Sequence, residues 1–194
     1  MPSDYRRVGL LGGSFNPAHD GHLYISEQAL KLLGLDEVWW LVSPQNPLKS
    51  ADGMAAFEKR MAAAEKVAAA NPRIHVSDAE ARLGTRYTAD TLAQLTDIQG
   101  QHRFVWLMGA DNLLQIHHWR SWSRIFRIVP VAVFGRPGYS LRATSSVAAR
   151  RFARDRWPQE AAKRLVDAEL PAWVFLRIRE NPLSASRIRA EGGF

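Results

Sequence analysis

The sequence predicts an α/β protein built on one doubly wound parallel β-sheet, and three observations favour this fold class. Short apolar segments alternate with amphipathic segments along the whole chain, which is the order of a strand–helix–strand protein. Two segments, 103–109 (RFVWLMG) and 129–135 (VPVAVFG), are apolar almost throughout, as expected for strands buried on both faces. The length of 194 residues fits one core and a single domain spanning 1–194.

The individual elements follow from hydrophobic periodicity. In the Ala-rich segment 54–70, apolar residues recur at helical spacing from Met54 to Ala68. The predicted helices are 21–33, 54–70, 88–98, 111–127 and a polar helical region at 145–168. The predicted strands are 6–12, 37–43, 73–78, 103–109, 129–135 and 173–178. Right-handed crossovers place helices on both faces of such a sheet, and ligands bind beyond the carboxyl ends of its strands.

Composition narrows the class of protein. The chain has no cysteine, which excludes disulfides, thiolate chemistry and a cysteine-built metal site. No signal-peptide pattern precedes the first strand and no apolar stretch is long enough to span a bilayer, so we expect a cytoplasmic protein without a membrane partner. The net charge is +7, and the excess between Arg142 and Arg164 is interpreted mainly as a solvated helix face. It is weak evidence for a nucleic-acid partner, and we expect none.

The stretch GLLGGSFNPAHDGH, residues 9–22, joins the first predicted strand to the first predicted helix. Gly12 and Gly13 would let the backbone turn tightly and approach a ligand, and the helix start offers N–H groups to an anion. His19 and His22 share a face if both lie in the first turn, and could donate to phosphate oxygens. A plain turn with surface histidines is the alternative. Zinc lacks a third ligand nearby, and the stretch matches neither a P-loop nor GxGxxG.

The segment GGSFNPAHDGH resembles the GxFxPxHxGH signature of the HxGH nucleotidyltransferase superfamily, whose members share a Rossmann-like sheet and transfer a nucleotidyl group from an NTP. A second superfamily motif, ISSTxIR, is similar to LSASRIR at residues 183–189, with Leu183, Ala185 and Ser186 as departures. Ser184 can cap a helix there, and Arg189 supplies a fork of donors for the β- and γ-phosphates.

The middle of the chain narrows the resemblance to one family. RLGTRYTADTL (82–92), MGADNLLQIHHWRSW (108–122) and FGRPGY (134–139) resemble the SYTxxTL, GxDxxxxxxxW and RRPGY segments of the nicotinate mononucleotide adenylyltransferases. With the two end motifs, the resemblance covers most of the chain. Lys49, in the NPLK loop, matches a basic position that approaches the mononucleotide phosphate.

The resemblance implies a set of site residues. Catalysis is assigned to His19, His22 and Arg189. ATP binding is assigned to Gly12, Gly13, Ser14, Phe15, His19, His22, Gly109, Asp111, Ser184, Ser186 and Arg189. Mononucleotide binding is assigned to Asn46, Lys49, Tyr87, Thr88, Asp111, Trp119 and Arg136.

The residue types suit these roles, and three of the residues also fit an ordinary structural role. Trp119 offers a flat face for a pyridine ring, and a helix start at Thr88 offers N–H groups to a nicotinate carboxylate. Taken alone, Trp119 also fits a core residue, Asp111 a helix N-cap and Lys49 a solvated side chain.

The expected reaction is therefore adenylyl transfer from ATP to nicotinate mononucleotide, with Mg²⁺ bridging the ATP phosphates and no metal site built by the protein. Nicotinamide mononucleotide and phosphopantetheine remain alternative acceptors, and a cytidylyltransferase would share both end motifs. A basic RNA-binding module and a non-catalytic relative are the readings outside this reaction class. The oligomeric state is left open.

Overall fold

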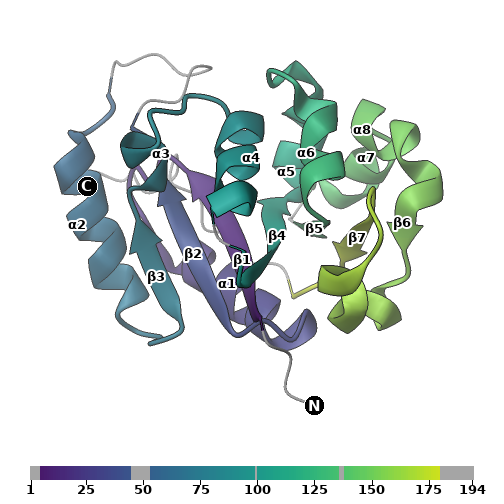
Figure 1. Cartoon of the computed structure of the whole chain (residues 1–194), viewed down its shortest axis with the longest axis horizontal. Helices are drawn as coiled ribbons and strands as arrows, with labels where there is room; N and C mark the ends of the chain where they lie inside the picture. The colour runs from purple at the N-terminus through teal and green to yellow at the C-terminus, as the bar shows by residue number, and fades with distance from the viewer. Residues whose placement is uncertain (1–4, 45–52, 99, 136–137, 180–194) are drawn as a thin grey trace.

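The computed structural model describes residues 5–44, 53–98, 100–135 and 138–179. One seven-stranded sheet runs through this part of the chain in the order β3-β2-β1-β4-β5-β7-β6, with every neighbouring pair parallel (Figure 1). The strands are β1 (Arg6–Gly13), β2 (Glu37–Val42), β3 (Ile74–Ser77), β4 (His102–Gly109), β5 (Val131–Phe134), β6 (Arg156–Trp157) and β7 (Trp173–Leu176). The predicted α/β fold class is confirmed.

Helices cover both faces of the sheet. They are α1 (Asp20–Leu32), α2 (Phe57–Ala68), α3 (Ala79–Arg82), α4 (Thr88–Ile98), α5 (Ala110–Gln115), α6 (Trp122–Ile128), α7 (Ser140–Thr144), α8 (Val147–Arg151) and the 3₁₀ segments η1 (Ile116–His118), η2 (Ala153–Asp155) and η3 (Gln159–Asp167). Side chains of a strand alternate between two cores. Leu10 packs with α4, α5 and α6, whereas Leu11 packs with α1, α2 and η3.

Two predicted helices are wrong in extent. The segment 111–127 is broken at Trp119, whose backbone is extended, and at Ser121, which adopts a left-handed conformation with φ 53°. The region 145–168 contains α8, two 3₁₀ segments and the short strand β6, preceded by α7. Pro158 precedes η3 and cannot continue a helix, and a strand of two residues is too short for a periodic pattern. The four-residue α3 was not predicted for the same reason.

The winding of the sheet reverses between β1 and β4. The chain proceeds outward from β1 to β2 and β3, and then returns to place β4 on the other side of β1. In doubly wound sheets the crevice beyond the carboxyl ends of these two strands is the usual ligand site. Among the described residues, no helix is both long and apolar enough to cross a membrane.

Candidate active site

The loop between β1 and α1 lies at this crevice, and its backbone is shaped by three residues. A Cβ atom at Gly12 would lie 2.3 Å from Cη2 of Trp106, so this position has no room for a side chain. A Cβ at Gly13 would meet the Phe15 ring at 3.5 Å, an ordinary contact. The left-handed conformation in this loop belongs to Phe15, with φ 46°, and to neither glycine. The expectation that the glycines supply the tight turn was therefore wrong; Gly12 is required by its contact with a neighbouring strand.

The two histidines form a capping box at the start of α1. His19 is the N-cap, and its Nδ1 accepts the main-chain N–H of Gly21 at 3.0 Å. The Nδ1 of His22 accepts the main-chain N–H of His19 at 3.2 Å, and the ring centroids lie 4.0 Å apart. Since each Nδ1 accepts a hydrogen bond, each neutral ring carries its proton on Nε2. The arrangement thus fixes which nitrogen of each imidazole is the donor.

The His22 ring rests on an aromatic platform. It lies 4.7 Å from the Phe15 ring and 5.9 Å from the Trp40 ring, and the latter two rings stack at 5.1 Å. The buried Ser26 hydroxyl accepts the Trp40 indole N–H at 2.8 Å and donates to the main-chain oxygen of His22 at 2.9 Å. These contacts with buried groups restrict the orientation of the His22 imidazole.

The other side of the crevice is formed by the end of β4. Gly109 is both the last residue of β4 and the N-cap of α5. Asp111 is therefore a half-buried residue in the first turn of α5, and its reading as the N-cap is wrong. Because β1 and β4 are adjacent and parallel, the first turns of α1 and α5 begin at the same edge of the sheet.

A second group of predicted residues lies where α4 begins. The helix starts at Thr88 as predicted, and the main-chain oxygen of Tyr87 accepts the N–H of Asp90 at 2.9 Å. The Arg120 guanidinium lies over the Tyr87 ring, 4.7 Å from its centroid. The preceding residue, Trp119, is half-buried against the core on this face. The structure thus brings the start of α4 close to the loop that carries Trp119.

Six predicted site residues lie outside the described part of the chain, and the structure does not place them. They are Asn46, Lys49, Arg136, Ser184, Ser186 and Arg189.

Arg60 was not among the site residues predicted from the sequence. Its side chain is buried, at 1% exposure, and donates to four main-chain oxygens beside the β1–α1 loop. A pattern could have revealed its burial: Arg60 stands four residues before Ala64 and eight before Ala68, which places it on the apolar face of α2.

Another pair of imidazoles lies in η1. The ring centroids of His117 and His118 are 3.9 Å apart. Even so, no group of three or more His, Cys, Asp or Glu side chains in the described ranges could hold a metal ion.

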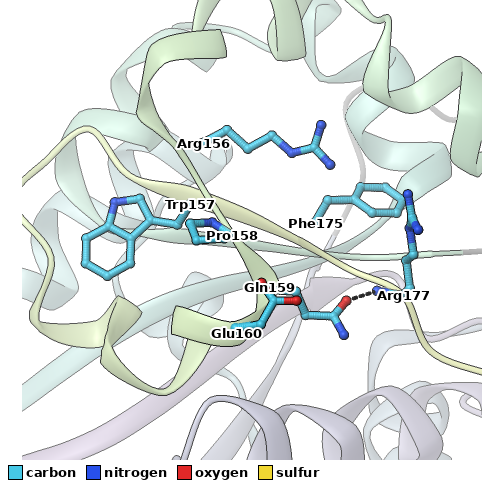
Figure 2. Close-up of a pocket in the computed structure, with 7 residues that line it drawn as sticks. All are labelled: Arg156, Trp157, Pro158, Gln159, Glu160, Phe175 and Arg177. Carbon is cyan, nitrogen blue, oxygen red and sulfur yellow. Dashed lines mark hydrogen bonds between the residues drawn. The ribbon is translucent and has the colours of Figure 1, made fainter.

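A cavity of about 510 Å³ lies at the outer edge of the sheet, beside β6 and β7 (Figure 2). Arg156 reaches over the Phe175 ring at 5.8 Å, and the main-chain N–H of Arg177 donates to Gln159 Oε1 at 2.7 Å. The residues that line this cavity are Arg156, Trp157, Pro158, Gln159, Glu160, Phe175 and Arg177. Strand β6 is four strand steps from β1, about 19 Å at about 4.8 Å per step, so this cavity is separate from the histidine pair.

Comparison with known proteins identifies the class. The model of the cytidylyltransferase-like family matches residues 10–191, so the chain is a nucleotidyltransferase by family. A relative from Parvibaculum lavamentivorans, named "Probable nicotinate-nucleotide adenylyltransferase", is 56% identical over 97% of this chain and 93% of its own length. A relative of the same name from Ruegeria pomeroyi is 51% identical over 96% of this chain and 87% of its own.

A solved structure agrees in fold. The Plasmodium falciparum nicotinic acid mononucleotide adenylyltransferase complexed with NaAD aligns with a TM-score of 0.71 at 16% identity, covering 96% of this chain and 83% of that one. The chain belongs to the nicotinate-nucleotide adenylyltransferase family. The family predicted from the motifs is confirmed.

Proposed function

We propose that the crevice around His19 and His22 transfers the adenylyl group of ATP to nicotinate mononucleotide, which yields nicotinate adenine dinucleotide and pyrophosphate in NAD biosynthesis. The observation that carries this proposal is the pair of imidazoles at the start of α1, each with its Nδ1 engaged by a main-chain N–H. Membership of the family supplies the reaction and the acceptor.

The chemistry needs no protein nucleophile. The phosphate of the mononucleotide is already anionic at neutral pH and attacks the α-phosphorus of ATP in line, while pyrophosphate leaves. Catalysis then consists of positioning and charge stabilisation. The Nε2–H groups of His19 and His22 donate to the α- and β-phosphate oxygens, where negative charge accumulates as the leaving group departs.

The remaining roles follow from position in the fold together with the family motifs. Gly12 and Gly13 at the end of β1, with Ser14 and Phe15 in the loop that follows, face the ATP phosphates, and Gly109 and Asp111 approach the nucleotide from the end of β4. Tyr87, Thr88 and Trp119 take the pyridine ring and its carboxylate. Predictions from the motifs alone assign Ser184, Ser186 and Arg189 to ATP, and Asn46, Lys49 and Arg136 to the mononucleotide.

Enzymes of this class generally use a divalent metal with ATP. We expect Mg²⁺, which neutralises phosphate charge when bound, and we expect it to arrive with ATP rather than at a site built by the protein. The half-buried Asp111 lies in the first turn of α5, beyond the carboxyl end of β4. From there its carboxylate could accept a hydrogen bond from a metal-bound water or a ribose hydroxyl. The cytoplasmic location and the lack of a nucleic-acid partner stay predictions from the sequence.

A substrate panel tests the proposal. Purified protein receives Mg-ATP with nicotinate mononucleotide, nicotinamide mononucleotide or phosphopantetheine, while pyrophosphate and the dinucleotide product are followed. We expect the acid mononucleotide to be the preferred acceptor. Turnover only with phosphopantetheine would mean that the acceptor assigned from the motifs in the middle of the chain is wrong. A preference for nicotinamide mononucleotide would mean that the pyridine-ring site selects the amide rather than the acid. No turnover with any acceptor, together with salt-sensitive RNA binding, would favour the alternative that the protein is a basic RNA-binding module.

A further inference from the structure

The buried guanidinium of Arg60 lies where three separate segments of the chain meet. Its Nη1 donates to the main-chain oxygens of Ser14 at 2.6 Å and Ser43 at 2.8 Å. Its Nη2 donates to Pro44 at 2.8 Å, and its Nε donates to Ala55 at 3.0 Å. One side chain therefore joins the β1–α1 loop, the exit of β2 and the approach to α2.

This arrangement differs from an ordinary buried ion pair. Burial lowers the pKa of Arg60 and the nearby Glu58 charge opposes the shift, but an arginine stays charged inside a protein. In the described part of the chain, no carboxylate lies within salt-bridge distance of it. Its direct polar partners are the four carbonyl oxygens, and its guanidinium lies 5.5 Å from the centroid of the Phe57 ring. Buried ionic groups are often no more stabilising than apolar side chains of similar volume. What the Arg60 guanidinium provides in addition is geometry, because one rigid fork fixes the relative positions of four main-chain oxygens.

Two of the segments that meet at Arg60 adjoin residues that the motifs assign to the substrates. Ser14 stands five residues before His19 in the β1–α1 loop. Pro44 directly precedes the segment 45–52, which contains the predicted phosphate ligand Lys49.

The far side of that segment is tied to the same loop by Asn16. Its Nδ2 donates to the main-chain oxygen of Gly53 at 3.0 Å, and its Oδ1 accepts the N–H of Ala55 at 3.2 Å. Ala55 is thus held through its N–H by Asn16 and through its carbonyl by Arg60. Both flanks of 45–52 are therefore bonded to the loop that leads into the histidine pair.

We propose that Arg60 is a positioning residue for adenylyl transfer: it fixes the β1–α1 loop, which leads into His19 and His22, against the exit of β2 and the approach to α2. The inference rests on the proposed function. An in-line displacement requires the attacking phosphate and the α-phosphate to be aligned, and a misplacement of about 1 Å can cost about 10²-fold in rate. Arg60 acts through main-chain atoms, so substrate binding to each separate loop survives its loss better than the alignment of the two substrates.

The test compares Arg60→Lys and Arg60→Met with Lys66→Met, a control on the exposed side of α2. Calorimetry with ATP alone and with nicotinate mononucleotide alone gives the number of intact sites and each Kd. The steady-state rate is then expressed per intact site. A variant that merely unfolds loses sites, whereas a misaligned site keeps its substrates and loses kcat.

We expect Arg60→Met to lower kcat per intact site about 10²-fold with each Kd within about threefold of wild type. Arg60→Lys keeps the charge but loses the planar fork, and should recover only part of this loss. Lys66→Met should match wild type. Wild-type kcat per intact site in both Arg60 variants would overturn the inference.

Asn16→Ala provides an independent variant should the Arg60 variants fail to fold, because it releases the opposite flank. It should lower kcat per intact site about tenfold at unchanged Kd, and an unchanged kcat would overturn the inference. A wild-type enzyme that turns over no mononucleotide would instead overturn the proposed function. Wild-type turnover combined with unaffected variants would overturn the role of Arg60 alone.

Discussion

The Nδ1 atom of His22 accepts the main-chain N–H of His19 across 3.2 Å, so one imidazole caps a helix and, when neutral, carries its proton on Nε2. Two functions thus depend on one ring. A glutamine at the same position can accept the same N–H, as Glu and Gln do in ordinary capping boxes, but it lacks the imidazole Nε2–H. The two functions can therefore be separated by substitution.

We expect His22→Gln to keep the capping hydrogen bond, to lose about 1 kcal/mol of ring packing against Phe15 and Trp40, and to lower kcat by about 10²- to 10³-fold. His22→Ala should lose the activity and, beyond the loss in the glutamine variant, about 1 kcal/mol of stability through the lost cap. Urea unfolding and pyrophosphate release measure the two effects. A glutamine variant as active as wild type would show that the ring is only a cap.

Gly12→Ala should destabilise the fold by about 1–3 kcal/mol, because the new Cβ would lie 2.3 Å from the ring of the buried Trp106. Gly13→Ala is the matched control. Its Cβ would meet Phe15 at an ordinary distance, so we expect near-wild-type stability. If the main chain at Gly13 does approach a phosphate, this control should still raise the KM for ATP. Equal stability losses in the two variants would contradict the assignment of Gly12 to packing.

Glu80 predicts a pH dependence of stability. Burial raises the pKa of this carboxyl, and a hydrogen bond from Ser43 opposes the shift only in part. The folded state then holds the proton more tightly than the unfolded chain does. The contribution of Glu80 to stability is therefore greatest below the ordinary glutamate pKa and declines as the pH rises toward the raised pKa.

We accordingly expect Glu80→Gln to raise the free energy of unfolding relative to wild type, by an amount that grows as the pH rises from the ordinary glutamate pKa of about 4.3 toward neutrality. Urea unfolding across that range gives the difference at each pH. Glu65→Gln, on the exposed side of α2, is the control and should reproduce the wild-type pH dependence. A stability difference for Glu80→Gln that does not change with pH would argue against a raised pKa.

Trp119→Ala should raise the KM for the mononucleotide about tenfold, as expected from the loss of about 1.4 kcal/mol of stacking, and leave the KM for ATP unchanged. Trp122 lies three residues further on but packs edge-to-face on Phe126 and Phe152, at 6.3 and 6.0 Å. Trp122→Ala should therefore cost about 2 kcal/mol of stability with little change in either KM. An unchanged KM for the mononucleotide in Trp119→Ala would show that Trp119 is only a packing residue of the core.

The sequence predicted the sheet well because its central strands are apolar on both faces and its longer helices are strongly periodic. The helix at 88–98 has the predicted bounds. The predictions of continuous helices over 111–127 and 145–168 were wrong, because the breaks in these segments depend on single-residue conformations and on a two-residue strand. Such features carry no repeat for a pattern to detect.

The candidate site was predictable where motif and position in the fold coincide, as at His19 and His22. The contacts of Arg60 could not be predicted, because its partners are main-chain atoms that no spacing of residue types reveals. Its burial was nevertheless encoded in the apolar face that it shares with Ala64 and Ala68. The roles of Lys49 and Arg189 rest on resemblance and stay predictions.

The four acceptors of Arg60 are all main-chain oxygens, and every amino acid supplies the same carbonyl group. Residues 14, 44 and 55 can therefore change identity over evolutionary time while this junction keeps its shape, so long as the local backbone is tolerated; Ser43 also uses its side chain, toward Glu80. Arginine itself has no such freedom, since no other side chain spans these acceptors with a planar fork. One constrained position in α2 thus leaves three of its four acceptor positions free to adapt.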